Sequence, residues 1–302
     1  MIDLHCHILP GVDDGAADIT VSLAMARAMV ADGVTSVACT PHILPGVYAN
    51  TGPQILGWVE QLQVALDQED IPLQLLSGAD VHMVPDAVAG LRSGQLLTLA
   101  GTRYVLIEPP HHVVPPRIEE FFFNLMIAGY VPILTHPERL SWIKGHYDSV
   151  LRLVEAGAWM QITAGSLLGD FGKSPQYWSE KMLAEGAVHI LATDSHDTVR
   201  RPPKLAKGRD RAATLVGAIE AERLVLGRPQ GIVANDPPGS LSPPVKPATN
   251  GARTSHDRYR AGNDSNREGP GAHGRDGSAA GGGFAERLRG LFRRDAGRGD
   301  RD

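Results

Sequence analysis

The chain of 302 residues has little cysteine, no long apolar run and no excess of positive charge. Its two cysteines, Cys6 and Cys39, both lie in short apolar segments, so we expect no disulfide framework and a reducing compartment. No segment has the apolar length of a signal peptide or a membrane span, which predicts a cytoplasmic protein. The formal net charge of −5 gives no sign of a nucleic-acid-binding protein.

Apolar residues make up 42% of the chain, but they are unevenly distributed. Residues 1–235 contain enough of them for a core, whereas residues 236–302 are dominated by Gly, Pro, Ser, Asn, Asp and Arg. So few apolar side chains cannot repay the entropy of ordering. We therefore expect one folded domain over 1–235 and a disordered tail over 236–302. Inside the tail, a basic amphipathic pattern predicts a short helix at 284–294 that could contact a membrane surface or a partner.

Within the body, short β-branched segments alternate with amphipathic helical patterns. This alternation predicts an α/β fold with a mainly parallel sheet, and seven strands favour a closed or nearly closed barrel. The expected strands are 1–7, 34–40, 73–80, 104–108, 131–136, 159–163 and 189–194. The expected helices lie near 18–30, 53–69, 85–93, 115–128, 147–156, 175–185, 203–216 and 218–226.

Metal-ligating side chains recur where these strands end. On the first strand Asp3, His5 and His7 share one face, and two imidazoles two residues apart can chelate one cation. The carboxyl ends of barrel strands form a single face of the molecule, so ligands distant in sequence are expected to converge there. The candidate ligands are His5, His7, His42, Asp80, Glu108, His136, Asp194 and His196.

This mixture of imidazoles and carboxylates suits Zn²⁺, Mn²⁺ or Fe²⁺ better than Ca²⁺ or Mg²⁺. Eight ligands exceed what one tetrahedral ion needs, so the site is expected to be multinuclear, with a carboxylate such as Glu108 as a bridge. A water held by such ions is deprotonated near neutral pH and becomes a hydroxide nucleophile for ester hydrolysis.

Arginines follow two of the candidate ligands and indicate which ester is hydrolysed. Arg139 lies three residues after His136, and Arg200 and Arg201 follow His196. The planar donors of a guanidinium match a phosphoryl group, so phosphomonoester hydrolysis is the predicted chemistry. Neither cysteine lies in a Cys-x5-Arg loop, so the cysteine-dependent phosphatase mechanism has no support.

These motifs resemble the PHP (polymerase and histidinol phosphatase) superfamily, and in particular its bacterial protein tyrosine phosphatases encoded with capsule and exopolysaccharide genes. The resemblance covers roughly residues 1–235 and rests on residues 2–15, 40–42, 107–108, 135–139 and 194–196. It implies a distorted (β/α)7 TIM-like barrel, the PHP fold, with three metal ions held by the eight candidate ligands. It also implies that Arg139 and Arg201 hold the phosphate and that a bacterial tyrosine autokinase is the natural substrate. His42, Asp13 and Asp14 are candidate proton donors to the leaving phenolate.

One position departs from the family pattern, because Asp80 stands where the family usually has a glutamate. The aspartate is one methylene shorter. Either the backbone lies closer to the metals, or Asp80 binds through water, or His82 on the same strand face substitutes in part.

Two other functions remain open from the sequence. The chain could be a histidinol-phosphate or other small-molecule phosphatase, although the motif His136-Pro137-Glu138-Arg139 resembles the tyrosine phosphatases. It could also be a catalytically weak regulatory module that keeps its metal site for stability. The DNA-proofreading role of the same barrel in polymerases is disfavoured by the acidic body.

Overall fold

A computed structural model of the chain describes residues 1–246, and the helix predicted at 284–294 lies outside them. The strands form two parallel sheets of order β1-β2-β4 and β3-β5-β6-β7-β8-β9. Their bounds are β1 (Ile2–Cys6), β2 (Ser36–Cys39), β3 (His42–Ile43), β4 (Gln74–Ser77), β5 (Asp80–His82), β6 (Tyr104–Glu108), β7 (Val131–Thr135), β8 (Trp159–Thr163) and β9 (Ile190–Ala192).

Two of the seven expected strands are each followed by a further short strand: β3 begins beyond the end expected at 40, and β5 begins at Asp80, where the third strand was expected to end. Thr40 and Pro41 separate β2 from β3, and Gly78 and Ala79 separate β4 from β5. A proline cannot donate to a ladder, so Pro41 is a natural point of interruption. β2 and β4 pair in the small sheet, and the strands that follow them, β3 and β5, pair in the large one. The chain thus turns through seven strand positions, as the sequence predicts.

The two sheets also meet along the other edge, between β1 and the residues after β9. Cys6 and Ser195 form an isolated parallel bridge. Asp194 N–H donates to His5 O at 2.8 Å, and His7 N–H donates to Ser195 O at 3.0 Å. These bonds bring the end of the last strand to the end of the first, and the predicted distorted barrel is confirmed.

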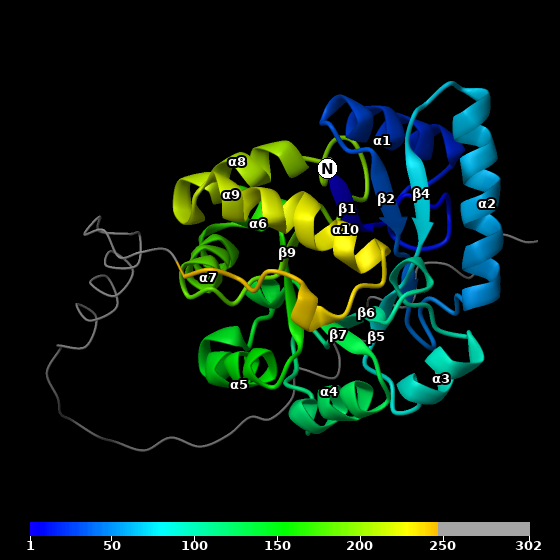
Figure 1. Cartoon of the computed structure of the whole chain (residues 1–302). Helices are drawn as coiled ribbons and strands as arrows, with labels where there is room; N and C mark the ends of the chain where they lie inside the picture. Colours follow the sequence, from blue (N-terminus) through cyan, green and yellow to red (C-terminus); the bar gives the residue numbers. More distant parts are fainter. Residues whose placement is uncertain (247–302) are drawn as a thin grey trace, which may run out of the picture. The chain divides into compact units, whose positions relative to one another are not determined.

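Helices surround the strands (Figure 1). α1 begins at Asp18, whose carboxylate accepts the Val21 N–H at 3.0 Å, and α2 begins with a capping box between Thr51 and Gln54. None of the helices within residues 1–246 has the length and apolarity that a membrane crossing requires. The helices are α1 (Ile19–Ala31), α2 (Gly52–Gln68), α3 (Ala87–Ser93), α4 (Ile118–Ile127), α5 (Ile143–Glu155), α6 (Ala164–Leu168), α7 (Lys173–Ala184), α8 (Leu205–Val216), α9 (Ala218–Glu222), and α10 (Arg228–Val233), which follows a π-helical turn.

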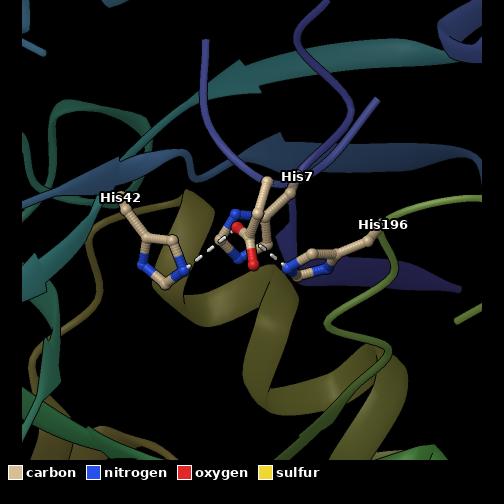
Figure 2. A group of neighbouring side chains, drawn as sticks. His7, His42 and His196 are labelled. Atoms are coloured by element: carbon tan, nitrogen blue, oxygen red, sulfur yellow. Dashed lines mark ion pairs between the residues drawn. The ribbon is translucent and has the colours of Figure 1, made fainter. Parts of the chain in front are cut away.

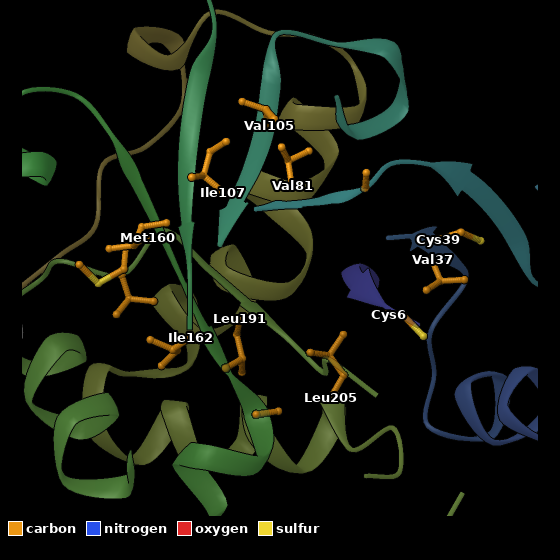
Figure 3. Packing of buried hydrophobic residues seen from close by; sticks show 14 of the residues in the cluster. Cys6, Val37, Cys39, Val81, Val105, Ile107, Met160, Ile162, Leu191 and Leu205 are labelled. Atoms are coloured by element: carbon orange, nitrogen blue, oxygen red, sulfur yellow. The ribbon is translucent and has the colours of Figure 1, made fainter. Parts of the chain in front are cut away.

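Alternate strand residues pack in two apolar clusters. One lies between strands and helices and includes Val105 and Ile107 of β6 and Leu205 of α8 (Figure 3). The other contains Tyr104 and Leu106 of β6 together with residues of other strands and of α10. Glu108 continues the strand face of Tyr104 and Leu106, so the candidate site lies beyond the carboxyl end of this second cluster.

The folded body extends past residue 235, where composition alone places its end. Arg228 is only 1% exposed and pairs with Glu220 at 2.5 Å. Its guanidinium also donates to Ser242 O at 2.7 Å and to Pro243 O at 3.0 Å. A buried guanidinium needs several acceptors, and the carbonyl groups of this polar segment supply them. Composition does not reveal this role, because the segment binds Arg228 through backbone carbonyl groups and not through apolar side chains.

His189, directly before β9, is expected to make the stability of the fold sensitive to acid. Its ring stacks on Trp159 at 4.7 Å, and Nδ1 accepts the Met160 N–H at 3.2 Å. Burial, together with the charge of Arg228, lowers the pKa of His189 to about 3. As the pH falls, the His189 ring is protonated in the unfolded chain near its usual pKa of about 6.5, while the folded chain keeps it neutral. Protonation therefore stabilises the unfolded state, and the free energy of unfolding decreases by about 2 kcal/mol between pH 7 and pH 5.

Replacing this residue by asparagine, His189→Asn, keeps an acceptor for Met160 and removes the titrating ring. We expect the melting temperature of the variant to fall less steeply than that of the wild type between pH 7 and pH 5. The difference in slope should amount to several degrees in thermal unfolding followed by circular dichroism. Parallel curves for the two proteins would contradict the assignment.

Candidate metal centre

All eight candidate ligands meet in one centre: six lie at or just beyond the carboxyl ends of β1, β6, β7 and β9, while His42 and Asp80 begin the short strands β3 and β5. The side chains of seven are buried, while His42 is 12% exposed. Among residues 1–246, five overlapping groups have ligand atoms within 4.8 Å of one another, and every candidate belongs to at least one. The groups are His7, Asp14, His42 and His196; His5, His7 and Asp80; His5, His136 and Asp194; His42, His82 and Glu108; and Glu108, His111 and His136.

The first group is formed around the ring of His7, which lies between His42 and His196 (Figure 2). The ring centroid of His7 is 4.0 Å from that of His196 and 4.5 Å from that of His42. Asp14 approaches Nε2 of His42 at 3.5 Å and Nε2 of His196 at 3.4 Å. Three imidazoles and one carboxylate facing a common point are a suitable donor set for a divalent transition metal.

Asp13 has a different position from Asp14, although both were candidate proton donors. Its carboxylate lies 2.7 Å from Nδ1 of His7 and accepts the His42 N–H at 3.0 Å. Asp13 therefore orients His7 from behind, as carboxylates do for metal-bound histidines. The turn that carries it packs tightly on this strand, because a Cβ atom on Gly15 would lie 2.1 Å from His7 O. Only glycine fits at that contact.

Asp80 reaches the centre despite its short side chain. Its Oδ2 is 3.5 Å from Nε2 of His5 and 3.4 Å from Nδ1 of His42, and the residue is fully buried. The pairing of β3 with β5 places Asp80 directly beside His42. These distances bring the Asp80 carboxylate within reach of the same centre as His5 and His42.

His82 and His111 enlarge the site around Glu108. Nε2 of His82 is 2.5 Å from Oε2 of Glu108, and Nε2 of His111 is 2.9 Å from its Oε1. The sequence suggested His82 only as a substitute and did not suggest His111. The signal for His111 in the sequence was its position three residues after Glu108, a carboxylate at the end of a strand. Gln161 was also missed; its Oε1 lies 2.9 Å from Nδ1 of His5 and fixes that ring.

Three buried carboxylates give the centre its electrostatic character. Burial opposes ionisation of Asp194, but Arg201, His5 and Arg139 outweigh it and hold its pKa well below the usual range. Burial likewise opposes a charge on His5, yet Asp194 and Asp80 raise its pKa to about 9. A proton on His5 balances the carboxylates in this way, whereas burial lowers the pKa of His136 and of His196 and keeps them neutral. Bound cations would also balance the carboxylates.

Two of the predicted arginines reach the centre and one does not. Arg139 and Arg201 both form an ion pair with Oδ2 of Asp194. Arg200 is 88% exposed at its side chain and pairs with Asp197 at 3.3 Å, on the surface. The phosphate-binding geometry expected from the sequence is therefore available to Arg139 and Arg201.

The backbone is strained where two candidate ligands follow their strands. His136 has a φ of 31° and Asp194 a φ of 49°, in the left-handed region that non-glycine residues rarely adopt. Such conformations are held by their surroundings and cluster at functional sites. Both residues lie at the turn after a strand, where the strain directs their side chains into the centre.

Phe171 supports both site arginines. The Arg139 Cζ atom is 4.6 Å from the centroid of its ring, and the Arg201 Cζ atom is 5.8 Å away. The ring can approach because residue 165 is a glycine, on which a Cβ atom would lie 2.9 Å from Cε2 of Phe171.

We expect Phe171→Leu, which keeps apolar bulk but removes the aromatic face, to raise KM for an aryl phosphate about 5- to 30-fold. Two cation–π contacts of about 0.5–1 kcal/mol each account for this range. Phe171→Tyr should stay close to the wild type. Steady-state kinetics with both variants measure the effect, and an unchanged KM in Phe171→Leu would contradict it.

Cys6 and Cys39 are unsuited to nucleophilic catalysis. Both are unpaired and fully buried. Burial raises the pKa of the Cys6 thiol well above its usual value, which keeps it protonated at neutral pH.

Unsatisfied polar atoms support a metal-binding role for the centre. Among the described residues, several buried ligand atoms have no hydrogen-bond partner, and uncompensated burial of such atoms is costly. They are Nδ1 of His42, both carboxylate oxygens of Asp80, Nδ1 of His136 and Nε2 of His196. Their concentration in the centre fits bound divalent cations, which would complete their coordination.

Comparison with known proteins places this architecture in a family. The family described as "Capsular polysaccharide synthesis, CpsB/CapC" matches residues 1–234. The tyrosine-protein phosphatase YwqE of Bacillus subtilis is 41% identical over 67% of this chain and 79% of its own length. The putative tyrosine-protein phosphatase CapC of Staphylococcus aureus is 33% identical over the same shares.

A solved structure agrees with the sequence relationships. It belongs to crystal structures of YwqE and of CpsB from Streptococcus pneumoniae, described as unique metal-dependent tyrosine phosphatases. The match covers 82% of this chain and 98% of the other, with 35% identity and a TM-score of 0.77. The resemblance inferred from the motifs is confirmed, and the chain belongs to the CpsB/CapC family of capsular polysaccharide synthesis proteins.

Proposed function

We propose that the chain is a metal-dependent protein tyrosine phosphatase that hydrolyses phosphomonoesters. The observation that carries this function is the placement of Arg139 and Arg201 on Asp194, inside a cluster of imidazoles and carboxylates. Metal ligands alone would suit many hydrolases. Two guanidinium groups beside them provide the fixed positive donors that a phosphoryl group requires.

The proposed ligands are the eight predicted residues, with Asp14, His82 and His111 as additions. The overlapping groups suit three ions of Mn²⁺, Fe²⁺ or Zn²⁺: one near His7 and His196, one near His5 and Asp194, and one near Glu108. When bound, these ions supply an activated water and neutralise charge on the phosphoryl oxygens.

In this proposal the chain's own groups position the ester and move protons. Arg139 and Arg201 exchange their bonds with Asp194 for bonds to the phosphate oxygens, and Phe171 keeps both guanidinium groups directed at the centre. His42, at the more exposed side of the cluster, is the proposed donor of a proton to the leaving phenolate. Asp14 is proposed only as a ligand, because His196 outweighs burial and holds its pKa well below the usual range, so that it has no proton to donate.

The proposed substrate is a phosphotyrosine protein. We propose that the natural substrate is a bacterial tyrosine autokinase of capsule or exopolysaccharide synthesis. The family description, the names of the relatives and the shared motifs support this proposal. We also propose a cytoplasmic location, because Cys6 and Cys39 are unpaired thiols, typical of a reducing compartment.

The test is a substrate panel with metal-replete protein: a phosphotyrosine peptide, the matching phosphoserine peptide, histidinol phosphate and an aryl phosphate. We expect turnover of the aryl phosphate and the phosphotyrosine peptide and at least about tenfold lower kcat/KM on the other two. A preference for histidinol phosphate would replace the proposal by a small-molecule phosphatase. Absence of turnover on all four would favour a regulatory module.

A further inference from the structure

An apolar groove lies beside the candidate metal centre, between the residues that follow β5 and those that lead into α4. Its volume is about 530 Å³, within the range of sites that bind small organic groups. Its walls include Met83, Val84, Pro110, Val113 and Phe121. Arg117 and Glu120 stand at its edge and pair with each other at 2.5 Å.

The groove and the metal centre share two short backbone segments. Met83 directly follows the candidate ligand His82, and its N–H donates to Glu108 O at 3.1 Å. In the loop after β6, His111 bonds to Glu108 while Pro110 and Val113 line the groove. One loop therefore presents a polar side chain to the metal centre and apolar ones to the groove. A molecule held at the centre is adjacent to this surface.

The chemistry of the groove specifies its occupant. Pro85, Pro110, Pro115 and Pro116 in the wall have no N–H to donate, and Met83, Val84, Val113 and Phe121 add apolar side chains. The polar lining residues are Arg117, Glu120 and Asn124. Val113 is 66% exposed, so its apolar surface is available to a ligand. Burying the apolar part of this wall favours an apolar partner.

We propose that this groove binds an apolar side chain flanking the phosphotyrosine of a substrate polypeptide and thereby selects the sequence that is dephosphorylated. The proposal rests on the proposed phosphatase function. The occupant is inferred from the continuity between groove and metal centre: the segments that carry His82 and His111 also line the groove, so a residue that flanks a phosphotyrosine held at the centre can reach it. A small aryl phosphate has no residue to place there and does not use the groove.

The experiment compares two phosphotyrosine peptides of equal length and charge, with leucine or serine on both sides of the phosphotyrosine. Val113→Asp puts a charge into the groove at an exposed position. Val64→Asp, at an equally accessible position on α2 that is 55% exposed and outside the groove, is the matched control. Both variants and the wild type are assayed on both peptides and on an aryl phosphate, after thermal unfolding shows equal stability.

The wild type and Val64→Asp should turn over the leucine peptide with about tenfold higher kcat/KM than the serine peptide. Val113→Asp should lose this preference and retain aryl phosphate turnover within about twofold. Equal turnover of the two peptides by the wild type, or an unchanged preference in Val113→Asp, would overturn the proposal. If the wild type hydrolyses aryl phosphate but neither phosphotyrosine peptide, the proposed protein phosphatase function fails as well, which distinguishes the two failures.

Discussion

Chelation of divalent metals is expected to lower turnover of an aryl phosphate by at least about 10³-fold. The described centre gathers buried carboxylates and imidazoles within a small volume, and its positive donors toward a phosphate are limited to Arg139 and Arg201. Without metal His5 holds a proton instead, as its raised pKa indicates. No activated water is then available, and several kcal/mol of transition-state stabilisation are lost.

The measurement is kcat/KM after dialysis against a chelator and again after titration with Mn²⁺, Fe²⁺ or Zn²⁺. Restoration by one ion identifies the preferred metal. His136→Ala, which removes a ligand shared by two of the groups, should recover little activity on titration. His146→Ala, at an exposed position on α5, is the matched control and should recover fully. Turnover that persists in chelated protein of verified low metal content would contradict the metal-dependent mechanism.

The candidate centre could be predicted largely because strand periodicity and barrel geometry act together. Each predicted ligand lies near the end of a segment whose pattern predicts a strand, and all such strand ends are expected to meet on one face. His111 and Gln161 were harder to find. His111 lies in a loop whose path depends on packing, since Ser141 N–H bonds to His111 O at 3.0 Å from across the site. Gln161 is an ordinary polar residue until its contact with His5 is known.

Arg200 and Arg201 show a similar limit. They are adjacent in sequence and identical in type, so composition cannot rank them. Asp197 settles their roles, because its carboxylate accepts the Val199 and Arg201 N–H groups at 2.7 and 3.1 Å and forms a compact turn. That turn directs Arg201 toward Asp194 and leaves Arg200 in solvent. The separation of β2 from β3 and of β4 from β5 has a similar cause, because it depends on the neighbouring strands with which each one pairs.

The contacts of residues 236–246 with the body could not be predicted for a different reason. Composition measures how many apolar side chains a segment can bury, and residues 236–246 have few. Their attachment depends on carbonyl groups that satisfy Arg228, and on Leu241, which packs against Gly231. Backbone acceptors are the same in every sequence, so no composition rule detects them.

Replacement of Arg139 is expected to give the second largest loss of activity. The guanidinium lies 17% exposed at the edge of the centre, paired with Asp194 and stacked on Phe171. Arg139→Ala removes one fixed donor to the phosphoryl oxygens, which typically costs about 10²–10³-fold in kcat. Arg139→Lys keeps the charge but not the planar pair of donors, so it should recover only part of the loss.

Arg152→Ala on α5 tests whether any loss of an arginine has this effect, because Arg152 pairs with Glu119 on the surface, 53% exposed. Its kcat should equal that of the wild type. Metal content separates two explanations for a defect in Arg139→Ala, since Asp194 loses one partner in that variant. If bound metal stays at the wild-type level while kcat falls, the arginine acts on the phosphoryl group. If metal content and activity fall together, its main role is to hold Asp194 in place, and the phosphate-binding role of Arg139 would have to be abandoned.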